Sequence, residues 1–313
     1  MIHKKIKIIF CGTPDFAVPT LKAISVNSEV ELIKVISMPD RPAGRGQKLK
    51  SPEVIDFCKE NDIPYLQTEN INREELPSDV DAIIVLAFAQ FLGKKILSLP
   101  RLGCFNIHTS LLPKYRGAAP IQYALLHGDQ TTGVSIQKMV SKMDAGDICH
   151  SIELPIAPSE SGGELYQRLK DQAAIEIDHF ISLLVHDRLS FHAQDESQVT
   201  FAPTLAKSSG FLNFKQSTFI TLYNQIRALK PWPGTYCFLN NKRLKVFTIE
   251  KSTLNLAPGE LSTQFDTMNI GCLNGSIRLL SIQLEGKKIT SDTELLNGLK
   301  NSNETLFINP ENP

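Results

Sequence analysis

Residues 6–24 read IKIIFCGTPDFAVPTLKAI, and this stretch decides the fold class. It joins a short apolar run to a turn at Gly12 and then to a helical segment. Strand, tight turn and helix in this order form the opening unit of a doubly wound α/β sheet. The pattern G-x-G-x-x-G is absent after the strand, so the turn does not predict a dinucleotide site.

The following segments continue this alternation of strands and helices. The nearly continuous apolar run within 81–92 is typical of a parallel strand that is buried on both faces. Apolar residues recur at helical spacing over 161–186, which predicts a long helix packed on the sheet. Further strands are predicted at 30–37, 63–66, 103–107 and 131–140, with helices at 53–60 and 118–129. We therefore predict that residues 1–191 form a Rossmann-like, doubly wound and mostly parallel sheet.

The pattern changes beyond residue 191. Residues 192–215 are polar and show no sustained period, which predicts a linker. Residues 216–313 begin with a helical segment, and short strands separated by glycines follow it. Regularly spaced short strands with turn signals predict a small β-barrel.

Composition places the chain among globular proteins of about two domains. Its 313 residues are 42% hydrophobic and 21% charged. The formal net charge is zero, but residues 1–199 carry 21 Lys and Arg against 25 Asp and Glu, and residues 200–313 carry 12 against 8. This asymmetry suits a basic C-terminal surface, and chance variation explains it about as well.

The six cysteines do not form a C-x-x-C motif or a Cys/His cluster with zinc spacing. They are typical of reduced, buried thiols, so we expect a cytoplasmic protein without a metal. No stretch approaches the ~18 apolar residues of a membrane helix, and we expect no membrane partner. We also expect a monomer.

The chemistry is predicted to lie in residues 103–120, GCFNIHTSLLPKYRGAAP. Side chains two apart on a strand share a face, so Asn106 and His108 project together at the strand end. An amide donor beside an imidazole suits a carbonyl that becomes an oxyanion. The alternative is that Asn106 caps a turn and that His108 is a buried, hydrogen-bonded histidine.

This whole run resembles the folate-dependent formyltransferase family, which carries N-x-H followed by SLLP and an R-G turn. The resemblance extends from Ile6 to about Asn297 and implies an OB-like β-barrel at the C-terminus. It also implies transfer of the formyl group of 10-formyltetrahydrofolate to the α-amino group of methionyl initiator tRNA. The third element of the family pattern is Asp144, in a D-x-G turn about forty residues after N-x-H. Turn aspartates are often structural, which is the alternative role for Asp144.

The resemblance assigns a role to each of the three residues. Asn106 would donate a hydrogen bond to the formyl oxygen, and a protonated His108 would add a second donor. Asp144 would keep His108 charged and would pass the amine proton through water to the departing folate nitrogen. Neither a metal nor a covalent intermediate is required.

The folate side is expected to include the loop after the catalytic strand and the end of the preceding strand. The resemblance assigns these contacts to Ser110, Leu111, Leu112, Pro113, Leu86 and Phe88. Contacts after the preceding strand would be made partly by the main chain. The alternative is that Phe88 and Phe91 are core aromatics.

A basic loop, residues 39–52, reads PDRPAGRGQKLKSP, and its prolines and glycines exclude a helix. It is predicted to be flexible. The resemblance implies that it contacts the acceptor stem of tRNA, and the alternative is an ordinary solvated loop. The predicted tRNA-binding residues are Arg41, Arg45, Lys48 and Lys50 of this loop and Lys207 of the linker.

Three other functions remain open at this point. A formyltransferase for a small amine would share the N-x-H and Asp elements, although a small substrate needs neither the basic loop nor the barrel. A hydrolase could release formate if water replaced the amine. A non-catalytic RNA-binding protein could keep the fold.

Overall fold

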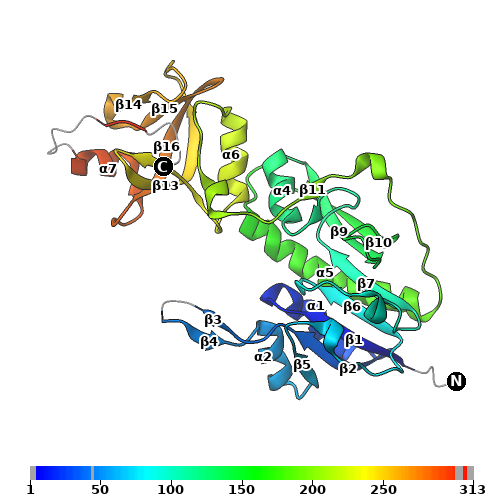
Figure 1. The fold of residues 1–313 in the computed structure, drawn as a ribbon. Coiled ribbons are helices and arrows are strands. Elements are labelled where there is room, and N and C mark those ends of the chain that lie inside the picture. The colour runs from blue at the N-terminus through cyan, green and yellow to red at the C-terminus, as the bar shows by residue number, and fades with distance from the viewer. Residues whose placement is uncertain (1–4, 44–45, 300–305, 309–313) are drawn as a thin grey trace. The chain divides into compact units, whose positions relative to one another are not determined.

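The computed structural model describes residues 5–43, 46–299 and 306–308, so that Arg45 of the basic loop lies outside the described residues (Figure 1). The chain divides into two compact units, which are not contiguous in sequence. Unit 1 comprises Met1–Pro120, Thr131–Pro155 and Tyr166–Pro203, and unit 2 comprises Ile121–Gln130, Ile156–Leu165 and Thr204–Pro313.

Unit 1 is built on a seven-stranded sheet with the strand order β10-β9-β7-β6-β1-β2-β5. Five strands are parallel to their neighbours: β1 (Ile6–Gly12), β2 (Val30–Ser37), β5 (Tyr65–Gln67), β6 (Ala82–Leu86) and β7 (Gly103–His108). Two antiparallel strands complete one edge, β9 (Thr131–Lys138) and β10 (Ile148–Pro155). The prediction of a doubly wound, mostly parallel sheet is therefore confirmed.

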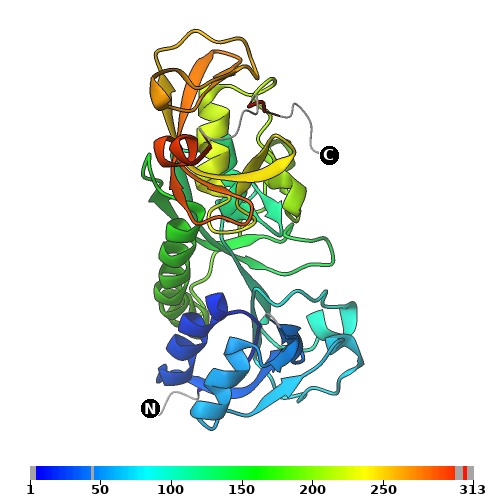
Figure 2. The same ribbon diagram turned by 90° about the vertical axis from the view of Figure 1, so that its left-hand side faces the viewer.

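Both faces of this sheet are covered, as the apolar character of its strands requires. Helices pack on one face, namely α1 (Val18–Val26), α2 (Glu53–Glu60) and the long α5 (Gly162–Val185), of which residues up to Leu165 belong to unit 2. The rings of Phe105 on β7 and Phe180 on α5 meet edge to face at 5.0 Å between centroids. α1 and α5 are neighbours in both views (Figure 1 and Figure 2), and Asn27 Nδ2 donates to Asp178 Oδ1 at 2.9 Å.

The opposite face carries shorter elements. Ile9, Cys11, Ile83 and Val85 point to a second buried cluster that η2 (Ile71–Arg73) and α3 (Lys94–Leu97) cover. The remaining elements of unit 1 are η1 (Asp15–Ala17), β3 (Arg41–Ala43), β4 (Lys48–Lys50), β8 (Arg116–Gly117), η3 (Glu196–Gln198) and β11 (Phe201–Ala202).

The predicted linker, residues 192–215, contains regular structure. Strand β11 pairs in parallel with β8, with Phe201 opposite Arg116 and Ala202 opposite Gly117. Residues up to Pro203 belong to unit 1, and the short helix η4 (Lys207–Gly210) belongs to unit 2.

Unit 2 is an antiparallel sheet that curls into a half-barrel around an apolar core, which confirms the predicted C-terminal architecture (Figure 1). Its strand order is β12-β13-β16-β15-β14, with β17 on β16. Leu222 and Ile226 of one helix share the core with Leu244 and Ile277 of the strands. The elements are α4 (Pro120–His127), of which Pro120 belongs to unit 1, α6 (Phe219–Ala228), β12 (Thr235–Leu239), β13 (Lys242–Ser252), β14 (Leu261–Ser262), η5 (Gln264–Asp266), β15 (Asn269–Cys272), β16 (Gly275–Leu284), β17 (Thr290–Ser291) and α7 (Asp292–Leu299).

All six cysteines are buried, and none is in a disulfide. Burial raises the pKa of the Cys58 thiol to about 11 and that of the Cys104 thiol to about 12. Among the residues that the structure describes, no helix combines the length and the apolar character needed to cross a bilayer.

Candidate active site

Strand β7 presents Asn106 and His108 at its end. In the sheet, Asn106 lies opposite Val85 of β6 on one side and opposite Gln137 of β9 on the other. The site therefore lies where the parallel strands end and the antiparallel edge begins. This is the edge at which open α/β sheets usually bind ligands.

The structure brings Asp144 to both of these side chains. Asn106 Nδ2 donates to Asp144 Oδ1 at 3.3 Å. His108 Nδ1 lies 3.8 Å from Asp144 Oδ2, and both side chains are largely buried. The amide, imidazole and carboxylate predicted from the sequence thus meet at one place, although 36 residues separate His108 from Asp144 in the chain.

The carboxylate of Asp144 is surrounded by hydrogen-bond donors. The backbone N–H of Gly117 donates to Oδ2 at 2.9 Å, and Gln137 Nε2 donates to Oδ1 at 3.0 Å. A carboxylate can accept all of these bonds, whereas a protonated carboxyl would turn one oxygen into a competing donor. The arrangement therefore holds the Asp144 carboxylate in a fixed orientation.

The turn that carries Asp144 depends on close backbone packing. Asp144 itself has a positive φ of 48°, a conformation that Asp tolerates better than most residues. A Cβ atom at Gly146 would lie only 1.7 Å from the carbonyl oxygen of Lys138. The D-x-G sequence is therefore needed for the shape of the turn as well as for its carboxylate.

The orientation of His108 follows from its second ring nitrogen. Nε2 lies 2.8 Å from the carbonyl oxygen of Tyr115, so Nε2–H donates to that oxygen. Nδ1 is consequently the nitrogen that faces Asp144. The 3.8 Å separation exceeds hydrogen-bond length, so Nδ1 is not committed to the carboxylate. It can still serve a group placed between them.

The loop after β7 is held by serine hydroxyls. Ser110 is fully buried and its Oγ donates to the carbonyl of Lys114 at 2.6 Å. Ser135 Oγ donates to the carbonyl of Ser110 at 2.7 Å and accepts from the backbone N–H of Leu112 at 3.1 Å. The hydroxyl of Ser110 is thus engaged within the loop, while Leu111 and Pro113 remain partly exposed beside it.

Comparison with known proteins agrees with this geometry. The family model for formyl transferase matches residues 4–179, and the model for the formyl transferase C-terminal domain matches residues 204–300. A methionyl-tRNA formyltransferase from Geobacter sulfurreducens is 39% identical over 301 residues, which is 94% of each chain. One from Syntrophus aciditrophicus is 39% identical over 312 residues, 97% of this chain and 99% of that protein.

The chain belongs to the methionyl-tRNA formyltransferase family. Among solved structures, the sugar 3N-formyl transferase WlaRD has a TM-score of 0.67 at 20% identity and covers 90% of this chain and 99% of its own. An N-formyltransferase from Helicobacter canadensis also reaches 0.67, at 19% identity, with 88% and 98% covered. At this identity the solved structures show a shared fold.

In this member of the formyltransferase family, the side chains at the end of β6 are buried, so a ligand there would be contacted by the main chain. Leu86 and Phe88 are each only 2% exposed, and Phe88 belongs to the second buried cluster. Ala87 and Ala89 have positive φ angles of 50° and 62°, so the chain turns sharply beside the catalytic strand. Phe91, by contrast, is 61% exposed and is not a core aromatic.

The basic loop of this family member is a β-hairpin. β3 and β4 pair antiparallel, with Arg41 opposite Lys50. Arg41, Lys48 and Lys50 are all exposed, and Lys50 Nζ is already hydrogen bonded to Glu53. Lys207 is exposed as well, but it lies in unit 2, whereas the hairpin belongs to unit 1.

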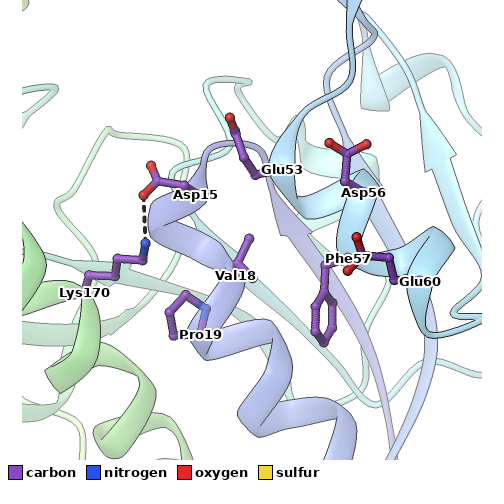
Figure 3. Close-up of a pocket in the computed structure, with 8 residues that line it drawn as sticks. All are labelled: Asp15, Val18, Pro19, Glu53, Asp56, Phe57, Glu60 and Lys170. Carbon is purple, nitrogen blue, oxygen red and sulfur yellow. Dashed lines mark hydrogen bonds and ion pairs between the residues drawn. The ribbon is translucent and has the colours of Figure 1, made fainter.

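Unit 1 also carries an open surface cleft of about 350 Å³ that contains none of the predicted site residues (Figure 3). Its lining includes four carboxylates, and Lys170 Nζ pairs with Asp15 Oδ2 at 2.7 Å. Folate and RNA are anionic, so the excess of carboxylates opposes their binding here. The lining residues are Asp15, Val18, Pro19, Glu53, Asp56, Phe57, Glu60 and Lys170.

Three polar groups of the site were not found from the sequence. Gln137 could have been suspected as a long polar side chain within a predicted strand, and the structure buries it in β9. The backbone N–H of Gly117 and the side chain of Gln194 carried no signal, since their contacts depend on chain segments that meet only in the folded protein. Within the described part of the chain, no group of three or more His, Cys, Asp or Glu could hold a metal ion.

Proposed function

We propose that this chain transfers the formyl group of 10-formyltetrahydrofolate to the α-amino group of methionyl initiator tRNA, which gives N-formylmethionyl-tRNA. The observation that carries the proposal is the convergence of Asn106, His108 and Asp144 at the end of β7. Membership of the family and the relatives' near-complete coverage support the choice of aminoacylated tRNA as the acceptor.

Asn106 and His108 supply the electrostatic part of catalysis. When the amine attacks the formyl carbon, the formyl oxygen gains negative charge. The Asn106 amide, which contacts Asp144 from β7, is the first donor to this oxygen. Nδ1–H of a protonated His108 is the second donor. One well-placed donor to an oxyanion lowers the barrier by roughly 3–4 kcal/mol.

Asp144 supplies the acid–base part. Its carboxylate would keep a protonated His108 paired, and its contact with Asn106 supports a role beside the attacking amine. The amine loses a proton as the new C–N bond forms, and the departing folate nitrogen gains one as the old bond breaks. Asp144 would pass this proton through water, so that neither the new amide nitrogen nor the departing folate nitrogen is left charged.

The folate side is proposed to lie between two backbone turns. One is the loop from Ser110 to Pro113, and the other is the turn after β6 at Leu86 and Phe88. Because the side chains of Leu86 and Phe88 are buried, their contacts with the pterin would be made by the main chain.

The RNA side is proposed to involve the exposed cations. Arg41, Lys48 and Lys50 lie on the hairpin, Lys207 is exposed in unit 2, and Arg45 completes the predicted set. Cations that neutralise phosphates provide affinity without reading sequence. We also propose that the protein acts as a cytoplasmic monomer, and the six buried, unpaired thiols fit a reducing compartment.

The experiment that tests the proposal uses 10-formyltetrahydrofolate labelled in the formyl group. The full chain is incubated with methionyl initiator tRNA, with uncharged initiator tRNA, or with small amines, and the label is followed. We expect label only on methionyl-tRNA. Label on a small amine, release of free formate, or no transfer at all would each overturn the proposal in favour of a different function.

A further inference from the structure

The segment after α5 is fastened to the catalytic unit at both ends. We call residues 192–202 the strap. At one end His192 and Ile148 exchange two backbone hydrogen bonds of 2.9 Å. At the other, the backbone N–H of Arg116 donates to the carbonyl of Thr200 at 2.9 Å, and β11 pairs with β8. The strap therefore lies against the two segments that flank Asp144 and Gly117.

Gln194 of the strap makes the closest contact with the catalytic turn. Its Nε2 donates to the carbonyl of Asp144 at 2.9 Å and to that of Gly146 at 2.7 Å. Its Oε1 accepts from Arg116 Nε at 3.0 Å and from Nη2 at 2.8 Å. The Gln194 amide thus donates from its nitrogen to the Asp144 turn and accepts at its oxygen from Arg116.

Arg116 and Glu196 hold this amide in place. Arg116 is 1% exposed, and its Nη2 also donates to Glu196 Oε1 at 2.9 Å. Glu196 Oε2 accepts a hydrogen bond of 2.8 Å from Nζ of Lys142, which lies two residues before Asp144 in the sequence. Hydrogen bonds from Arg116 and Lys142 hold the pKa of Glu196 at about 2, so it stays ionised at neutral pH.

We propose that Gln194 is a positioning residue for formyl transfer, which fixes the backbone of the Asp144 turn and thereby the direction of the Asp144 carboxylate. This inference rests on the proposed function. Gly117, whose backbone N–H donates to the Asp144 carboxylate, directly follows Arg116 in the sequence. The Gln194 amide therefore fixes the positions of both the carboxylate and one of its donors. A displacement of about 1 Å in such a constellation can cost 100-fold in rate.

Two substitutions separate this role from a purely structural one. Gln194→Met keeps the length of the side chain but removes both the amide donor to the turn and the acceptor for Arg116. Gln194→Glu keeps the acceptor for Arg116 but sets a carboxylate against the carbonyls of Asp144 and Gly146. Gln198→Ala is the matched control, because Gln198 lies on the same strap and its side chain bonds only to Asp195 among the described contacts.

The test measures kcat and KM for both substrates with the full chain, together with the thermal unfolding midpoint of each variant. We expect kcat to fall about 10- to 100-fold in Gln194→Met and further in Gln194→Glu, with each KM within about threefold of wild type. Gln198→Ala should match wild type. If Gln194→Glu does not fold, Gln194→Met carries the comparison.

The outcomes distinguish the two proposals. An active wild type whose Gln194→Met variant keeps kcat within twofold would overturn the positioning role alone. A raised KM at unchanged kcat would overturn it as well, since a positioning role in catalysis acts on kcat. A wild type that transfers no formyl group to methionyl-tRNA would overturn the proposed function and the inference together.

Discussion

Asp144 is the residue on which the site depends most, because its two oxygens meet four different donors or ring nitrogens. Asn106 and Gln137 face Oδ1, while Gly117 and His108 face Oδ2. Each of these four groups suits a hydrogen-bond acceptor at the Asp144 oxygen that it faces. An amide in place of the carboxylate would turn one of its ends into a donor that faces other donors.

The first prediction follows from this arrangement. Asp144→Asn should lower kcat about 10²- to 10⁴-fold, the range for loss of a general acid–base group, with little change in affinity for tRNA. Steady-state kinetics with methionyl-tRNA, together with filter binding, measure both quantities. Asp147→Asn is the control, since Asp147 is exposed in the same turn. Equal kcat values for Asp144→Asn and Asp147→Asn would contradict the role of Asp144.

For the individual residues of the site, the sequence predicted their types better than it predicted their contacts. The period of two in β7 predicted correctly that Asn106 and His108 lie together. Spacing alone could not bring Asp144 to them, because the contact depends on β9 pairing antiparallel with β7. Gln194 had no pattern to reveal it, since its segment has no period and its partners, two backbone carbonyls and the Arg116 guanidinium, lie far away in the sequence.

Among the elements, the β3–β4 hairpin differs most from its prediction. The prolines and glycines correctly excluded a helix, but the described part of the loop forms paired strands rather than an unstructured arm. Cross-strand pairing sets Arg41 opposite Lys50, which would repel each other if Glu53 did not neutralise Lys50. The hairpin therefore presents Lys48 as an exposed cation that forms no ion pair within the described part of the chain.

The second prediction concerns this hairpin. Lys48→Ala should weaken tRNA binding and flatten the slope of log K against log salt by about one, the effect of losing one phosphate contact. Glu53→Gln should strengthen binding, because it releases Lys50 from its ion pair. Binding titrations at several salt concentrations measure both changes, with Lys95→Ala of α3 as the control. An unchanged slope in Lys48→Ala would exclude a phosphate contact there.

The larger elements were easier to predict than the hairpin. Helix α5 was expected over 161–186 and spans Gly162–Val185, because its buried leucines and isoleucines recur at helical spacing over about five turns. The strap was expected to be a linker, because strands of two residues such as β8 and β11 leave no periodicity in a sequence. Long periodic elements are thus predictable, and short pairings set by distant partners are not.

For the molecule as a whole, stability against acid should depend on an ion pair in unit 2 whose carboxylate is buried. Asp292 is 1% exposed, accepts from Arg278 Nε at 2.9 Å and from the backbone N–H of Met268 at 2.9 Å. Burial opposes ionisation of Asp292, but the hydrogen bonds outweigh it and lower the pKa of the carboxyl below its usual value. The ionised pair therefore stabilises the folded state.

The third prediction gives the sign of this effect. A carboxyl whose pKa is lowered by folding adds stability above its unfolded pKa of about 3.9, and loses it as the pH falls through the folded pKa. Asp292→Asn should cost about 1–3 kcal/mol of unfolding free energy at pH 7, and the cost should shrink below about pH 4. Urea unfolding at pH 7, 5 and 3 measures it. As a control, Glu250→Gln removes the more distant, exposed partner of Arg278 and should lower the unfolding free energy far less. A loss of unfolding free energy in Asp292→Asn that does not change with pH would contradict the prediction.

The anchoring of residues 192–202 bears on how this enzyme could be shortened. A fragment trimmed to the matched catalytic region, 4–179, would still contain Asn106, His108 and Asp144. It would leave the buried guanidinium of Arg116 without Gln194 and Glu196, and it would remove the Gln194 amide that donates to the carbonyls of Asp144 and Gly146. A truncated version designed to keep its chemistry should therefore extend at least to Pro203, even though neither recognised domain includes those last residues.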